Sequence, residues 1–576
     1  MNKMNNKNLT IKETFASALQ NHQKNFFKIA ENLYKEILKI NPNHFGSIFY
    51  LGTLLVQTQR FELAIPLLSK ATQINPNYAA AHNNLGAALK ELGEYQSAIN
   101  CCQKAIQINP NYADAHNNLG ATLKELGEYQ NAINCCQKAI QIQPDLESAH
   151  LNLGLVFQEL GKFKKSISCF QKAIQIRPSY IKAHQNLMEA YEKTNQKKEL
   201  KSAISNAETL IKDNPIIKLY KGIMLNNNEK FSEAKNCLES ILFDTKDIKN
   251  EILRVTTLAK CYDRTEDNDK AFNYFTKANN LFPKIRKVKY FDKNRYLEEI
   301  RIRKKFFKKS TIEKWSTLKL SSKEPSPIFL IGFPRSGTTF LDTILRSHPS
   351  IDVIEEKFMV KKLIDSLNEL PNGGLESLKE IENDQLKKIR KTYFESLGWH
   401  IKNKNTSKLY IDKLPLNIIH VGEIIRIFPD AKFIVSLRHP CDCVLSCFMQ
   451  DFELNDAMAN FLDLEDAAHL YDDVMHLWTQ YTSIFSINYH EIKYENLVKN
   501  FEPTVKSILN FLKLSWNTSM LEYSKTATKR ENIATPSYAQ VIKPIYSHAI
   551  GRWKRYEKQT TNIYPILEKW IKKYNY

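Results

Sequence analysis

Apolar residues in the first half of the chain follow a helical spacing that itself repeats. Within short segments they fall three or four positions apart, which is the spacing of one face of an α-helix. The segments also recur as units: "NPNYAAAHNNLGAALKELGEYQSAINCCQKAIQI" is followed directly by "NPNYADAHNNLGATLKELGEYQNAINCCQKAIQI". Prolines at 42, 76, 110, 144 and 178 mark one point of successive units, each 34 residues after the last. The pattern predicts about seven or eight stacked helix pairs over residues 9–283.

Small residues allow the two helices of one unit to approach closely. Gly86 lies in the first helix of its unit, and Ala98 and Ala105 lie in the second. One such pair cannot bury its apolar face alone, so the units must stack. In period, small residues and proline the segment resembles the tetratricopeptide-repeat family. The resemblance implies a curved α-solenoid that binds a peptide or another protein; the alternative is that the solenoid dimerises or stiffens the chain.

A different pattern begins after "SSKEPSP", whose two prolines mark a domain boundary. Short apolar runs at 327–332 and 432–437 are each followed by a helical pattern. This alternation predicts parallel strands flanked by helices, with ligands at the carboxyl ends of the strands. The predicted architecture is thus an α-solenoid followed by an α/β phosphate-loop domain over residues 326–576, with residues 284–325 as a basic helical connector.

Composition leaves several partner classes open. The 576 residues include 82 Lys and Arg against 62 Asp and Glu, a net charge of +20, which suits nucleic acid, an anionic substrate or a membrane surface. In the basic run "KIRKVKYFDKNRYLEEIRIRKKFFKK" the apolar residues fall at helical intervals. We therefore interpret the run as an amphipathic connecting helix with a solvated basic face, and nucleic-acid binding is not favoured.

Targeting and metal signals are weak in this sequence. No apolar stretch approaches the length of a membrane span, and the polar start "MNKMNNKNLTIKETF" lacks the apolar middle of a secretory signal. The ten cysteines show no zinc spacing. We expect a cytoplasmic protein with reduced thiols, no membrane span and no metal.

The stretch "SPIFLIGFPRSGTTFLDTILRSHP" has the layout of an anion-binding loop: an apolar strand, a turn and a helix. Gly332 and Gly337 have the four-residue gap of a phosphate loop, and a helix beginning near Gly337 offers unpaired N–H groups. In nucleotide-hydrolysing loops a lysine follows the second glycine. Here Thr338 and Thr339 follow it, and Arg335 stands inside the loop. The loop therefore predicts a site for a tetrahedral anion without magnesium.

These residues resemble the loop with which sulfotransferases bind the 5′-phosphosulfate of 3′-phosphoadenosine 5′-phosphosulfate (PAPS). The resemblance assigns five residues to this group: Arg335, Ser336, Gly337, Thr338 and Thr339. In "AKFIVSLRHPCDCVLSCFMQ", Arg438 ends a strand and Ser446 lies on the next helix. This pair is similar to the 3′-phosphate site of the family, where charge-assisted bonds from the arginine discriminate against ATP.

The catalytic half is most similar to the tyrosylprotein sulfotransferases, over most of residues 326–560. The resemblance makes Glu356 of "DVIEEKF" the catalytic base, with Glu355 as the fallback, and makes Lys413 of "IDKLPLN" a support for the transferring sulfuryl group. A carboxylate can accept the proton of an attacking hydroxyl, and cations such as Arg335 and Lys413 can stabilise charge on the leaving oxygen.

Further matches complete the predicted site. Tyr494 of "KYENL" and Arg552, which precedes a tryptophan, are assigned to the nucleotide, and Ser537 to the reaction centre. His348 and His439 are interpreted as a loop-capping residue and a strand-end packing residue rather than as catalytic groups.

Two departures bear on the acceptor. Phe358 stands where the tyrosylprotein enzymes carry an arginine that selects acidic peptides, and Gln450 stands at another basic position of that family. The predicted reaction moves a sulfuryl group from PAPS to a hydroxyl acceptor, favoured as a tyrosine-like protein group, with the repeats binding the substrate or a partner. The alternatives are a glycan or small-metabolite sulfotransferase, a repeat scaffold with an inactive transferase half, and a nucleic-acid binder.

Overall fold

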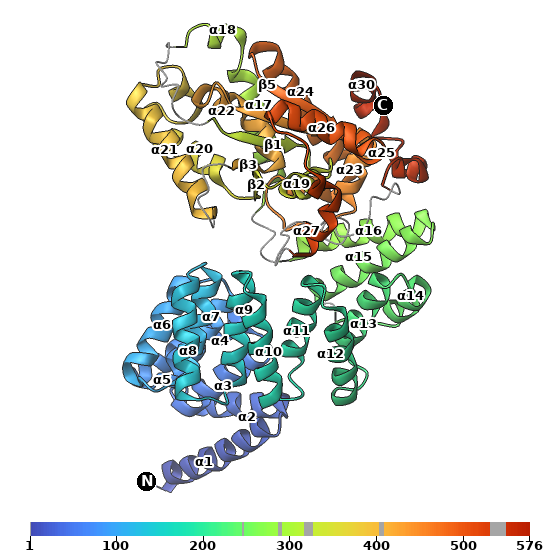
Figure 1. The fold of residues 1–576 in the computed structure, drawn as a ribbon. Coiled ribbons are helices and arrows are strands. Elements are labelled where there is room, and N and C mark those ends of the chain that lie inside the picture. Colours follow the sequence, from blue (N-terminus) through green and yellow to red (C-terminus); the bar gives the residue numbers. More distant parts are fainter. Residues whose placement is uncertain (1, 245–246, 286–290, 316–325, 402–407, 530–548) are drawn as a thin grey trace. The chain divides into compact units, whose positions relative to one another are not determined.

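The computed structural model describes residues 2–244, 247–285, 291–315, 326–401, 408–529 and 549–576. It forms two compact units, Met1–Met224 and Leu225–Tyr576 (Figure 1). The described part of the first unit is helical throughout, whereas the second unit combines helices with a five-stranded sheet.

The first unit is built from helix pairs. Its helices are α1 (Asn2–Gln23), α2 (Phe27–Ile40), α3 (Phe45–Gln57), α4 (Phe61–Ile74), α5 (Ala79–Glu91), α6 (Tyr95–Ile108), α7 (Ala113–Glu125), α8 (Tyr129–Ile142), α9 (Glu147–Glu159), α10 (Phe163–Ile176), α11 (Ile181–Lys193), α12 (Lys197–Leu210) and α13 (Pro215–Asn227), which crosses into the second unit. From α3 to α13 the first helices of successive pairs begin 34 residues apart. The α-solenoid that the proline spacing predicts is confirmed.

Two ladders of polar side chains join the repeats. Asn118 Nδ2 donates to Asn83 Oδ1, and Asn152 Nδ2 donates to Asn117 Oδ1, both at 2.8 Å. A histidine Nε2 in each of four repeats also donates, at 2.8 to 3.0 Å, to the carbonyl of the proline that precedes its helix: His82 to Pro76, His116 to Pro110, His150 to Pro144 and His184 to Pro178. Asn83 and Asn117 are buried, so each repeat satisfies a polar group of its neighbour.

The second unit contains a parallel sheet with the strand order β2-β3-β1-β4-β5. Its strands are β1 (Ile328–Gly332), β2 (Ile351–Glu355), β3 (Leu409–Lys413), β4 (Lys432–Leu437) and β5 (Asn488–Lys493). Its helices are α14 (Phe231–Glu239), α15 (Ile248–Arg264), α16 (Asn268–Leu281), η1 (Phe282–Lys284), α17 (Lys293–Phe306), α18 (Lys309–Ile312), α19 (Thr338–Arg346), α20 (Met359–Asn368), η3 (Gly374–Leu378), α21 (Asn383–His400), η4 (Pro415–His420), α22 (Val421–Ile427), α23 (Pro440–Phe448), η5 (Met458–Leu462), α24 (Leu464–Ile484), α25 (Tyr494–Lys499), α26 (Phe501–Leu512), η6 (Thr518–Glu522), α27 (Tyr523–Lys529), η7 (Arg552–Tyr556), α29 (Glu557–Thr560) and α30 (Tyr564–Lys573).

The sheet is buried on both faces, as expected of a parallel sheet. Leu330 of β1 belongs to a core cluster with Ile344 of α19. The preceding residue, Phe329, stacks on Phe433 of β4 with ring centroids 5.4 Å apart, and its ring lies 6.0 Å from that of Tyr393 on α21. Alternate strand residues thus pack against different helices, which confirms the predicted α/β architecture.

The compact units divide the chain earlier than the predicted domain limits at residues 283 and 326. The last repeat-like pair, α15 and α16, belongs to the second unit. Asn279 Nδ2 of α16 donates to the Phe448 carbonyl at 3.0 Å, and the ring of Phe272 stacks on that of Phe448 at 5.0 Å. These contacts with the end of α23 fasten the helix pair to the α/β fold.

Helix α17, inside the predicted connector, pairs its cations with distant acids instead of presenting a fully solvated face. The buried Arg303 lies 2.9 Å through Nε from Oε1 of the buried Glu423. Burial opposes the charge of Glu423, but Arg303 outweighs it and keeps the pKa of this carboxyl below its usual value. Three further pairs hold the helix: Lys293 with Asp466, Arg295 with Asp456, and Lys304 with Asp473. The basic connector is therefore largely neutralised from within.

Candidate active site

Each of the five strands carries a predicted site residue at its carboxyl end. The anion loop follows β1, Glu356 follows β2, Lys413 ends β3, Arg438 follows β4 and Tyr494 follows β5. Because the strands are parallel, these residues lie along one edge of the sheet. Strand β1 lies between β3 and β4, so the loop is flanked by Lys413 on one side and Arg438 on the other.

The loop after β1 depends on a glycine at its end. Gly337 has a φ of +98°, and a Cβ atom there would lie 2.6 Å from Cδ2 of Tyr494, so a side chain is excluded by backbone strain and by contact. Ser336 is buried, and its hydroxyl has no hydrogen-bond partner in the described residues. Thr338 and Thr339 are buried in the first turn of α19. A buried hydroxyl and the helix N–H groups are thus available to an anion.

Arg335 links the two halves of the predicted anion site. Its Nε donates to Oγ of Ser446 on α23 at 3.1 Å. The sequence assigns these residues to different phosphates, whereas in the structure they bind each other. Their contact brings the loop after β1 against the helix that follows β4.

Arg438 is held beneath the loop. Nη1 donates to the Arg335 carbonyl at 3.1 Å and Nη2 to the Ala549 carbonyl at 2.5 Å, while Nε is buried without a hydrogen-bond partner in the described residues. Its guanidinium lies 5.2 Å from the centre of the Tyr494 ring. Burial opposes its charge, but nearby acidic groups, Asp442 first, raise the pKa of Arg438. A permanent cation with one unused donor suits a phosphate.

Glu356, Glu355 and Lys413 form a cluster on the other side of β1. Lys413 is fully buried, and its Nζ lies 2.7 Å from Oε1 of Glu356 and 3.5 Å from Oε1 of Glu355. Adjacent carboxylates were expected to point apart. Glu356 instead has a φ of +49°, which ends the alternation of the strand and allows both carboxylates to reach Lys413. The Glu356 side chain is 32% exposed against 8% for Glu355, so Glu356 is the more accessible to an acceptor.

Comparisons with known proteins agree with this geometry. Residues 327–518 match the model of the sulfotransferase family. Residues 79–112, 113–146 and 148–180 match the tetratricopeptide repeat, and residues 52–93 match a further repeat model. The chain combines tetratricopeptide repeats with a sulfotransferase domain.

Individual relatives are distant. An uncharacterized protein of Aquifex aeolicus (strain VF5) is 29% identical over 324 residues, which are 55% of this chain and 41% of that protein. Protein-tyrosine sulfotransferase 1 of Danio rerio is 26% identical over 251 residues, 41% of this chain and 68% of that protein. The crystal structure of MamA is 30% identical, covers 29% of this chain and 96% of its own, and has a TM-score of 0.25. The chain thus spans less than half the length of the Aquifex protein.

The C-terminal stretch of the sulfotransferase domain is bound by two aspartates that the sequence did not single out. Asp442 of α23 accepts from the backbone N–H groups of Gly551 and Trp553 at 2.7 and 2.8 Å. Asp263 of α15 pairs with Arg552 at 2.9 Å. Asp442 follows the predicted Arg438 by four residues, but nothing in the repeat pattern marks Asp263. The predicted Ser537 lies outside the described residues.

The two histidines have the structural surroundings expected of them. His348 shares a hydrogen bond of 3.0 Å with the Ser515 carbonyl and accepts from the Ser350 N–H at 3.1 Å. The ring of His439 stacks on Trp553 at 5.1 Å, and burial lowers the pKa of this imidazole. Neither arrangement indicates a proton-transfer role.

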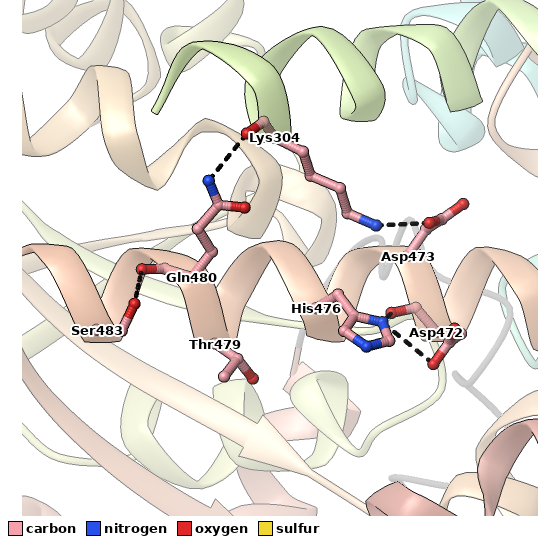
Figure 2. A pocket seen from close by; sticks show the side chains of 7 residues that line it. All are labelled: Lys304, Asp472, Asp473, His476, Thr479, Gln480 and Ser483. Carbon is pink, nitrogen blue, oxygen red and sulfur yellow. Dashed lines mark hydrogen bonds and ion pairs between the residues drawn. The ribbon is translucent and has the colours of Figure 1, made fainter. Parts of the chain in front are cut away.

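A hollow beside α24 lies apart from the predicted residues. Figure 2 shows its lining: Lys304, Asp472, Asp473, His476, Thr479, Gln480 and Ser483. Lys304 pairs with Asp473 at 2.5 Å, and Gln480 donates to the Lys304 carbonyl at 2.9 Å. Since these groups are bound to one another, the hollow offers few polar atoms to a ligand.

Two further searches were limited to the described residues. They contain no group of three or more His, Cys, Asp or Glu side chains that could hold a metal ion. None of their helices is both long enough and apolar enough to cross a membrane.

Proposed function

We propose that this protein transfers a sulfuryl group from PAPS to a hydroxyl acceptor. The observation that carries the proposal is the pair of anion-binding features at adjacent strand ends: the loop after β1, with Ser336 and Arg335, and Arg438 after β4. Nucleotides that carry a 3′-phosphate as well as a 5′-anion need two such features. The similarity to the sulfotransferase family over residues 327–518 supports the same assignment.

The residues present fit PAPS by their chemistry. The Ser336 hydroxyl and the Arg438 Nε are buried polar atoms without a partner in the described residues, and such atoms are expected to meet a ligand. We infer that residues 335–339 hold the phosphosulfate and that Arg438 and Ser446 hold the 3′-phosphate. Tyr494 packs over Arg438 and against Gly337, so it would shape the nucleotide side of the site, and Arg552 is proposed to contribute through its own segment.

The acceptor side would use Glu356 and Lys413. When bound, PAPS supplies the sulfuryl group and its phosphate as the leaving group. Glu356 would accept the proton of the acceptor hydroxyl. Lys413 and Arg335, both cationic, would stabilise the charge that develops on the leaving oxygen. Ser537 remains a proposed neighbour of the reaction centre.

We propose a protein hydroxyl, tyrosine-like, as the acceptor, and the repeats as the surface that binds this substrate or a partner protein. The named relatives include protein-tyrosine sulfotransferases, and a stacked-repeat solenoid presents an extended binding surface.

One observation favours a second candidate, a glycan or small-metabolite acceptor. Phe358, two residues after Glu356, is 66% exposed and cannot pair with acidic side chains. An aromatic ring at this position suits an uncharged acceptor better than an acidic peptide.

The test is calorimetric titration with 3′-phosphoadenosine 5′-phosphate (PAP), with AMP, and with ATP plus magnesium, on the parent protein and on Arg438→Ala. PAP should bind more tightly than AMP or ATP. Arg438→Ala should weaken PAP binding by one charge-assisted hydrogen bond or more, roughly 1.5 to 3 kcal/mol. Preference for ATP, or no nucleotide binding, would contradict the proposal. Transfer of labelled sulfate from PAPS to tyrosine peptides, sugars and phenols would then separate the two acceptor candidates.

A further inference from the structure

We propose that Asp263, on the last repeat-like helix pair, is a positioning residue for the nucleotide site. The inference rests on the proposed function, since it concerns how tightly PAP is held. Asp263 lies on α15, more than a hundred residues before the anion loop, and its side chain is only 9% exposed. Nothing in the tetratricopeptide pattern requires a buried acid there.

Asp263 accepts several hydrogen bonds from η7, the short helix after the C-terminal segment. Arg552 Nη2 lies 2.9 Å from Oδ2, and Arg555 Nη2 lies 3.1 Å from Oδ1. The Tyr556 hydroxyl donates to Oδ1 at 2.8 Å, and Arg555 Nη1 donates to the Asp263 carbonyl at 3.1 Å. One carboxylate therefore binds three side chains of a single helical turn.

The other end of η7 is fixed to the nucleotide side. Asp442 accepts from the N–H groups of Gly551 and Trp553. Two residues earlier, the Ala549 carbonyl accepts from Arg438 Nη2 at 2.5 Å. The segment that orients the proposed 3′-phosphate arginine is thus bound from two sides, by α23 through Asp442 and by α15 through Asp263.

The charges favour a positioning role over direct contact with the nucleotide. Arg552 and Arg555 face the same carboxylate, so without Asp263 two cations would lie beside each other in a half-buried place. Their repulsion would move η7, and with it the Ala549 carbonyl that holds Arg438. Arg552, which the sequence assigns to the nucleotide, would then act chiefly through Asp263.

The experiment compares Asp263→Asn with Asp269→Asn in the full-length protein. Asp269 offers a matched control, because it also joins the helix pair to the C-terminal region, accepting from Gln559 Nε2 at 2.5 Å, but in an exposed contact. Calorimetry gives the Kd for PAP and for AMP, and thermal melting without ligand reports folding. Asp263→Asn should weaken PAP binding about ten- to a hundredfold and lower the preference for PAP over AMP, while Asp269→Asn should leave both unchanged.

The outcomes separate the inference from the proposed function. No PAP binding by the parent protein would refute the proposed function. PAP binding by the parent that is unchanged or tighter in Asp263→Asn would overturn only the inference, and so would an equal loss for PAP and AMP, which a merely structural residue would produce. If Asp263→Asn does not fold, Tyr556→Phe and Arg555→Gln, which each remove one donor, should shift the preference in the same direction; an unchanged preference in both would also overturn it.

Discussion

The asparagine ladder of the repeats and the anion loop of the sulfotransferase domain treat buried polar atoms in opposite ways. In the ladder, Asn83 and Asn117 are satisfied by the equivalent side chains of the next repeat. In the loop region, the Ser336 hydroxyl and the Arg438 Nε are buried without such a partner in the described residues. The difference indicates that the ladder serves stability, while the loop keeps donors available to a ligand at a cost in stability.

The sharpest way to break this comparison is to remove the proposed base. Glu356→Gln should lower the rate of sulfate transfer by about a hundred- to ten-thousandfold, because the amide cannot accept the hydroxyl proton. PAP affinity and the melting temperature should change little, since the amide can still accept from Lys413. The rate of labelled sulfate transfer checks this, with Glu355→Gln as the matched control. A larger loss in Glu355→Gln would make Glu355 the base.

A glycine in each region gives the next contrast. Gly337→Ala places a side chain at a φ of +98° and 2.6 Å from Tyr494, which should cost about 1 to 3 kcal/mol of strain and abolish most PAP binding. Gly86→Ala would place a Cβ 2.8 Å from Cys102 Sγ, and it should lower stability by about 1 to 3 kcal/mol without affecting PAP affinity. Calorimetry and thermal melting of both variants decide; weakened PAP binding in Gly86→Ala would contradict the division of roles.

The buried Asp412 makes a pH-dependent prediction. Burial raises the pKa of this carboxyl from 3.8 to about 8. Between these values the unfolded chain has lost the proton that the folded protein keeps, so the stability contribution of Asp412 falls as the pH rises. Asp412→Asn should therefore be more stable than the parent by at least about 1 kcal/mol at pH 8, and by less at pH 5.

Urea unfolding at the two pH values measures this gap. The exposed Asp145 of the repeats supplies the control, since Asp145→Asn should show no pH-dependent difference from the parent. A gap for Asp412→Asn that stays constant between pH 5 and pH 8 would show that the buried carboxyl does not titrate in this range.

The smallest effect is expected in the repeats. His116→Ala removes the hydrogen bond to the Pro110 carbonyl, 3.0 Å long and at an exposed site, and should destabilise the protein by about 0.5 to 1 kcal/mol. Because the contact recurs, the double variant His116→Ala and His150→Ala should lose about twice as much. Thermal melting measures both, with the exposed His469→Ala as the reference. A loss no greater than that of the reference would show that this ladder adds no stability.

The sequence predicts the regular parts of the molecule well for a physical reason. The solenoid follows from local periodicity, so the proline spacing anticipates helices that begin 34 residues apart. Strand–loop–helix patterns likewise indicate that the anion loop and Arg438 lie at strand ends. Sequence reasoning did not find the partners of Asp263 and Arg303, because each contact joins residues more than a hundred positions apart. It also expected Glu355 and Glu356 to diverge, since a positive φ at a glutamate leaves no mark in the sequence.

The ion pairs of α17 bear on the order in which the chain acquires its structure during synthesis. The acids that neutralise Arg295, Arg303 and Lys304 lie 161, 120 and 169 residues further along. The repeats bind mainly to their neighbours and can assemble as they leave the ribosome. Helix α17 must wait, with its cations in water, until the acids of the sulfotransferase domain have been translated. A pause or truncation late in translation should therefore leave a finished solenoid followed by a sticky basic helix.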